Sequence, residues 1–135
     1  MSVGVLIITH EGIATAILET AANIFGKCPL RVEVLPAARD CDTDVLRNRV
    51  KQKVEQLDDG NGVLVLLDIY GSTPSNVACS VVDEDRVRVI SGLNLPMLVR
   101  IFNYPTLALP ELAKKAVSGG KDGIFVCHGG ESKDA

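Results

Sequence analysis

Two short stretches of the chain are almost wholly apolar, and they constrain the fold more than any other feature of the sequence. Residues 3–8 read VGVLII and residues 63–67 read VLVLL, without alternation of apolar and polar side chains. A strand with this pattern is covered on both faces, which is typical of a parallel sheet packed between helices. We therefore expect these two stretches to be the central strands of such a sheet.

Helical periodicity follows each predicted strand. Apolar residues recur at three- and four-residue spacing after residue 12, and Gly26 stands where that helix would end. Thr73-Pro74 offers a cap and a first-turn proline for a later helix. The predicted helices are 13–25, 42–57 (capped by Asp42 or Thr43), 73 to about 82, 95–102 and 109–117; further strands are predicted at 30–35, 86–90 and 123–127. Strands separated by helices imply right-handed βαβ units, so we predict an α/β fold with a three-layer, doubly wound sheet.

The bulk composition limits the classes of function. The chain of 135 residues has room for one domain, predicted at 1–130 with a polar tail at 131–135, and its net charge of −3 is not that of a nucleic-acid-binding surface. Without a signal-peptide pattern or an apolar run of about 20 residues, we expect a cytoplasmic protein that does not insert into the membrane. The four cysteines show no CxxC spacing, so we predict no metal site.

Candidate site residues follow the ends of the predicted strands. Thr9-His10 ends the first strand and Asp68 ends the third, and ligands in such sheets bind beyond the carboxyl ends of the strands. If these strands are neighbours, the histidine and the aspartate can meet. A carboxylate that accepts from Nδ1–H orients the ring and leaves Nε2 as a nucleophile. Two helix N-termini at this edge suit a phosphoryl group, and the predicted phosphate contacts are Thr9, Gly71, Ser72 and Thr73.

Each of these residues also has a purely structural interpretation. A lone histidine at a strand end is often a hydrogen-bonded structural residue, and Asp68 could simply cap a turn. Phosphorylation on Asp68 itself would require further carboxylates at the end of the first strand to hold a divalent cation, whereas that strand ends in Thr9-His10. Neither GxGxxG nor a Walker pattern is present, so nucleotide binding has little support.

Three segments together resemble a known family. THEG at residues 9–12, LLDIYGSTPSN at 66–76 and SGLNLPML at 91–98 resemble the IIA component of the mannose-type bacterial phosphotransferase system, over nearly the whole chain. The resemblance implies a phosphotransferase without a cofactor. It would accept a phosphoryl group from HPr on His10, with Asp68 hydrogen-bonded to that histidine, and pass the group to a IIB protein in sugar uptake or its regulation.

The sequence departs from the family pattern at three site positions. Thr73 stands where many members have serine and keeps the hydroxyl. Ser72 stands where many have a second glycine, so the loop is less rich in glycine than the common form and its phosphate contacts can differ. Glu11 stands where glycine is common and adds a negative charge beside the histidine. Two other functions stay open: a histidine carrier for dihydroxyacetone kinase, and a regulatory module whose partners depend on phosphorylation without transport.

The resemblance also implies an assembly. The family sheet has an antiparallel edge strand that is often exchanged between the subunits of a homodimer, and residues 123–127 are its counterpart here. Pairing would cover an exposed apolar edge that otherwise invites aggregation. We expect His128, just beyond this segment, to be non-catalytic.

Overall fold

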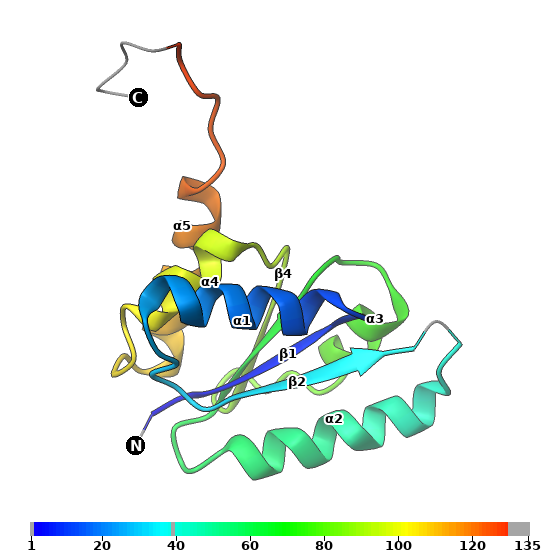
Figure 1. Ribbon diagram of the computed structural model, residues 1–135. Helices are drawn as coiled ribbons and strands as arrows, with labels where there is room; N and C mark the ends of the chain where they lie inside the picture. The colour runs from blue at the N-terminus through cyan, green and yellow to red at the C-terminus, as the bar shows by residue number, and fades with distance from the viewer. Residues whose placement is uncertain (1, 39, 130–135) are drawn as a thin grey trace.

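The described residues form one sheet of four parallel strands. The computed structural model describes residues 2–38 and 40–129 (Figure 1). The strands, in the spatial order β2-β1-β3-β4, are β1 (Gly4–His10), β2 (Val32–Ala37), β3 (Val63–Leu67) and β4 (Val87–Ser91). The predicted α/β fold with two central apolar strands is therefore confirmed, since β1 and β3 lie side by side in the middle of the sheet.

In the described part of the chain, five helices cover the two faces of the sheet. They are α1 (Ile13–Phe25), α2 (Thr43–Leu57), α3 (Thr73–Cys79), α4 (Leu95–Phe102) and α5 (Leu109–Asp122). Buried residues of α1, α4 and α5 share one apolar cluster, and those of α2 and α3 share another. Figure 1 shows α1 and α2 on opposite sides of the sheet, which gives three layers.

Alternate residues of the central strands supply the two clusters. In β1, Val5 and Ile7 belong to the α1–α4–α5 side, whereas Leu6 and Ile8 belong to the α2–α3 side, and all four are fully buried. This explains the absence of polar residues between Val5 and Ile8, because either face of the strand would bury them without hydrogen-bond partners.

The structure decides between the two predicted caps of α2 and differs from the predicted boundaries of α3 and α5. Asp42 caps α2 by accepting from the backbone of residues 44 and 45, and Ser72, not Thr73, caps α3. The α3 helix ends at Cys79 because the Ser80 hydroxyl and backbone N–H both bond to the Val77 carbonyl and close its last turn. The α5 helix runs five residues past 117, where its glycines allow close packing on α4.

The predicted antiparallel edge strand at 123–127 is wrong for the single chain. Gly123 closes α5 by donating to the Gly119 carbonyl, and residues 124–129 form no regular structure and extend away from the sheet (Figure 1). A strand needs a neighbouring backbone to pair with, and α5 ends in a direction that carries this segment away from β4. The predicted polar tail at 131–135 lies outside the described residues. In the described part of the chain, no helix has the length and apolarity needed to cross a bilayer.

Candidate functional site

A histidine and an aspartate meet at the carboxyl edge of the sheet. His10 is the last residue of β1 and Asp68 follows β3, and the parallel pairing of Ile8 with Leu67 brings the two strand ends together. The distance from His10 Nδ1 to Asp68 Oδ2 is 2.8 Å, and the backbone N–H of His10 donates to the same oxygen at 3.0 Å. The sequence predicted this contact between residues 58 positions apart.

The two partners differ in exposure. The side chain of His10 is 50% exposed, whereas that of Asp68 is 12% exposed. Burial raises the pKa of Asp68, but hydrogen bonds from the His10 ring, the His10 backbone and the Ile69 backbone together hold that pKa below its ordinary value. Asp68 is therefore a fixed negative charge beside an accessible ring.

This arrangement has a definite chemical consequence. An ionised carboxylate only accepts hydrogen bonds, so the contact with Asp68 requires the proton of a neutral ring to be on Nδ1. The lone pair is then on Nε2, in a ring open to solvent. An orienting carboxylate and a free ring nitrogen are the components of a nucleophile.

Thr9 shapes the start of α1 from inside the protein. Its side chain is completely buried, and its hydroxyl donates to the His10 carbonyl at 2.7 Å and accepts from the Ala14 N–H at 3.0 Å. Gly12, between His10 and the helix, has a φ of 91°, a conformation that glycine adopts without strain. The Thr9 hydroxyl thus connects the His10 carbonyl to the Ala14 N–H in the first turn of α1, and its predicted contact with phosphate stays a prediction.

The loop after β3 contains the other predicted phosphate contacts. Gly71 makes the turn with a φ of 89°, and its N–H donates to Ser75 Oγ at 3.2 Å. The Ser72 hydroxyl donates to the Ile69 carbonyl and accepts from the Ser75 N–H. Thr73 is exposed at the start of α3. Gly71 and Ser72 lie in the loop that begins at Asp68, and Thr73 begins the helix that follows it. Their binding of phosphate remains a prediction.

Sequence reasoning missed several residues of this edge. Ser75 is completely buried, and its hydroxyl oxygen accepts from the Gly71 N–H, so it holds the loop against the protein interior. Ile69 and Tyr70 are large apolar side chains that are exposed beside the His–Asp pair. The sequence could have indicated the exposure of Ile69 and Tyr70. They lie between a buried strand and the turn at Gly71, where a large apolar side chain is not placed to pack in the core.

Comparison with known proteins identifies the family. The profile of the EIIA-man family, described as the PTS system fructose IIA component, matches residues 4–117. The chain belongs to this family of phosphotransferase-system components. The match contains both His10 and Asp68, and it confirms the resemblance found in the sequence.

Individual relatives agree with this assignment. The chain is 31% identical over 127 residues to the PTS system mannose-specific EIIAB component of Escherichia coli K12, a match that covers 92% of this chain and 39% of the relative. It thus spans about two fifths of that relative. It is 29% identical to the PTS system fructose-specific EIIA component of Bacillus subtilis, covering 93% of this chain and 86% of the relative.

Solved structures of IIA proteins share the fold. The mannose/sorbose specific IIA subunit from Enterococcus faecalis superposes with a TM-score of 0.84 at 23% identity, covering 98% of this chain and 100% of the other, a likeness of fold alone. The IIA protein associated with the fucose utilization operon of Streptococcus pneumoniae gives a TM-score of 0.78 at 28% identity, covering 93% and 96% of the two chains.

Proposed function

We propose that this IIA chain is a cytoplasmic phosphocarrier that accepts a phosphoryl group on His10 Nε2 from phosphorylated HPr and passes it to a IIB protein in sugar uptake. The observation that carries the proposal is the 2.8 Å contact between His10 Nδ1 and Asp68 Oδ2 beneath a half-exposed ring. The Nδ1–H group donates to the Asp68 carboxylate, so Nε2 is the ring nitrogen that can attack phosphorus.

The transfer step balances without a cofactor or a metal. The Nε2 lone pair forms a new N–P bond as the bond between phosphorus and the donor's ring nitrogen breaks, and that nitrogen keeps the bonding electrons. The proton on Nδ1 stays in place, where Asp68 stabilises the positive charge that develops on the ring. The proposed contacts to the phosphoryl oxygens are backbone N–H groups and the exposed Thr73 hydroxyl. For the hydroxyls of Thr9 and Ser72 to join them, each must first give up its bond to the His10 or Ile69 carbonyl.

Labelling with phosphorylated HPr tests the function. The wild-type chain should take up the label, and His10→Ala should remove it, while His128→Ala should keep it. The adduct should be labile to acid but stable to base. Release by base would identify an acyl phosphate and move the site to Asp68, which would overturn the proposal.

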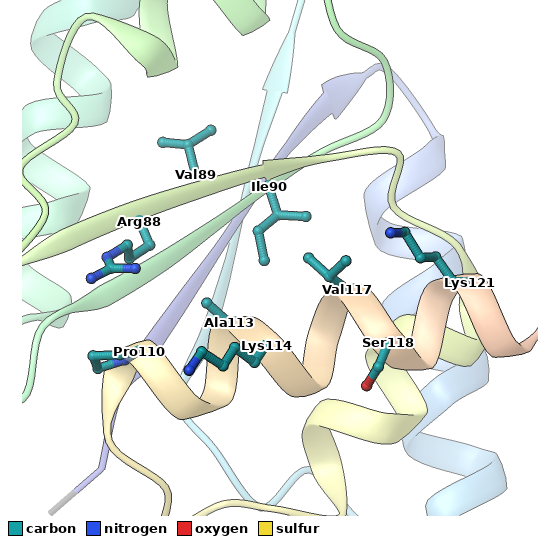
Figure 2. A pocket seen from close by; sticks show the side chains of 9 residues that line it. All are labelled: Arg88, Val89, Ile90, Pro110, Ala113, Lys114, Val117, Ser118 and Lys121. Carbon is teal, nitrogen blue, oxygen red and sulfur yellow. The ribbon is translucent and has the colours of Figure 1, made fainter.

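We also propose that the chain forms a homodimer through residues 124–127. Ile124, Phe125 and Val126 are exposed apolar residues in a segment that leaves the domain after α5. The β4 strand is one of the two edge strands of the sheet, and a groove of about 460 Å³ runs between it and α5. Figure 2 shows Ile90 of β4 and Ala113 and Val117 of α5 directed toward one another in this groove. The segment of a second copy would supply an antiparallel partner for β4.

A further inference from the structure

Large apolar side chains are exposed in the two segments that carry His10 and Asp68. Tyr70 is 73% exposed and Ile69 is 57% exposed, in the loop that begins at Asp68, and Ile13 is also exposed at the first turn of α1. These residues come from the two segments that hold the His–Asp pair. We call Ile13, Ile69 and Tyr70 the apolar rim. Apolar residues grouped beside a reactive group on an exposed surface are characteristic of a protein-binding site.

The same two segments carry no positive charge. Residues 9–20 and 68–82 contain no lysine or arginine, whereas Glu11 directly follows His10 and is exposed. A phosphoryl group brings about 1.5 to 2 negative charges at neutral pH. Glu11 therefore repels the group that His10 is to receive, and neither of these segments supplies a lysine or arginine to balance it.

We propose that the apolar rim and Glu11 form a docking surface for a phosphorylated protein whose own lysine or arginine side chains lie beside its phosphate. This inference rests on the proposed function and names the partner chemistry that the site selects. The donor's apolar side chains pack on Ile69 and Tyr70, and its basic side chains approach Glu11 while they neutralise the phosphoryl group in transfer.

Glu11 then acts in opposite directions on two kinds of donor. A basic protein is attracted by it, so Glu11 raises the rate of productive encounter. A small phosphorylated anion brings no cation and is repelled, so Glu11 protects His10 from adventitious phosphorylation. Such a repulsive element is a common means of specificity.

The first test compares Glu11→Gln with the wild type on two donors. With phosphorylated HPr, the variant should show a KM about two- to five-fold higher, the size of one exposed charge pair. With phosphoramidate, which carries a P–N bond and releases ammonia, the variant should react about two-fold faster. In 1 M salt, where the Debye length is about 3 Å, both effects should disappear. Glu19→Gln, further along α1, makes the same change in net charge and should move neither rate.

Opposite signs on the two donors are the decisive result, because a purely structural effect of Glu11 would move both rates together. An unchanged or lower KM for HPr would overturn the proposal. Arg39, two positions after the last residue of β2 in the sequence, is outside the described residues, so Glu11→Gln is also measured in an Arg39→Gln background. If the effect of Glu11 vanished there, its partner would belong to this chain and the proposal would fail.

The second test removes part of the apolar rim. Ile69→Ser should raise the KM for phosphorylated HPr about five-fold, since a residue at the centre of an interface contributes more than 1 kcal/mol, and should leave the rate with phosphoramidate unaltered. Ile24→Ser is the matched control, because Ile24 is 60% exposed, against 57% for Ile69, but lies at the far end of α1. Equal behaviour of the two variants would contradict the docking surface.

Failure of the docking surface is distinguishable from failure of the proposed function. If His10→Ala still accepts the label, the phosphocarrier assignment fails whatever Glu11 does. If His10 is labelled but Glu11→Gln and Ile69→Ser behave like their controls, the phosphocarrier stands and only the docking surface is lost.

Discussion

At the scale of single residues, Asp68 links the backbone and the chemistry of the site. One of its oxygens accepts from both the ring and the backbone of His10, and the other accepts from the Ile69 N–H at 2.9 Å. The carboxylate thus holds the end of β1, the start of the loop after β3 and the ring in one arrangement. Its substitution should therefore affect both transfer and stability, but by separate mechanisms.

Asp68→Asn tests the effect on transfer. An amide can donate its N–H to Nδ1, which would move the ring proton to Nε2 and remove the nucleophilic lone pair. We expect the chain to fold and transfer to slow by about 10- to 100-fold, the range found when a group that orients a histidine is replaced. Circular dichroism checks the fold and the labelling rate checks transfer; an unaltered rate would reduce Asp68 to a structural residue.

The pH dependence of stability tests the electrostatics of Asp68. The pKa of this carboxyl is lower in the folded chain than in the unfolded chain, so the ionised form stabilises the fold. This contribution is present above the unfolded pKa, about 3.9, and is lost as the pH falls through the lowered folded value. Urea unfolding of wild type and Asp68→Asn should differ most near pH 6 and converge toward pH 2. A constant difference would contradict the assigned charge.

The residues of the site divide by how they could be predicted. His10 and Asp68 were predicted because each follows an apolar strand, and parallel topology places such ends at one edge. The roles of Ser75 and Ser72 in the loop were not, because each depends on hydrogen bonds whose geometry is set only once Gly71 has turned the chain. Local hydroxyl-to-backbone bonds compete closely in such turns, so spacing alone favoured Thr73 as the cap.

At the scale of secondary-structure elements, α4 and α5 pack closely because the C-terminal half of α5 carries glycine. A Cβ placed on Gly119 would lie 2.4 Å from Arg100 Cβ, and one on Gly123 would lie 2.4 Å from Pro96 Cβ. The Asn94 side chain adds to this contact, since it caps α4 and donates to the Gly120 carbonyl at 3.1 Å. Helical periodicity predicted both helices. It placed the end of α5 at residue 117, because glycine has a low helix propensity and no apolar side chain to continue the periodic pattern.

Gly119→Ala tests this packing. The added methyl group must displace backbone-proximal atoms of Arg100, and we expect the free energy of unfolding to fall by about 1–3 kcal/mol, the usual cost of overpacking. Chemical denaturation measures it. Gly129→Ala is the control, because a Cβ there meets nothing within 4 Å and should leave stability as it is. A stabilised Gly119→Ala chain would show that helix propensity outweighs the contact.

At the scale of the whole molecule, the segment after α5 has no strand to pair with in the described part of a single chain, whereas a second copy could offer one. The segment 123–127 was predicted to be an edge strand, but within the described residues it pairs with no neighbouring backbone. Sequence periodicity predicts the preference of a segment; pairing depends on topology and, for an edge strand, on assembly.

Val126→Asp tests the proposed homodimer. A charge in the middle of the apolar segment should prevent its burial in the groove between β4 and α5, so the variant should sediment as a monomer when the wild type sediments as a dimer. Glu111→Gln, on the exposed surface of α5, is a control that should stay dimeric. A monomeric wild type, or an equally dimeric Val126→Asp chain, would rule out this interface.

The most direct test of the central claim is the site of the N–P bond. Nuclear magnetic resonance of the phosphorylated chain, with ¹⁵N-labelled histidine, distinguishes the two ring nitrogens of His10 and of His128 through their coupling to phosphorus. The contact between Nδ1 and Asp68 predicts phosphorus on Nε2 of His10. Phosphorus on Nδ1 of His10, or on His128, would contradict the account.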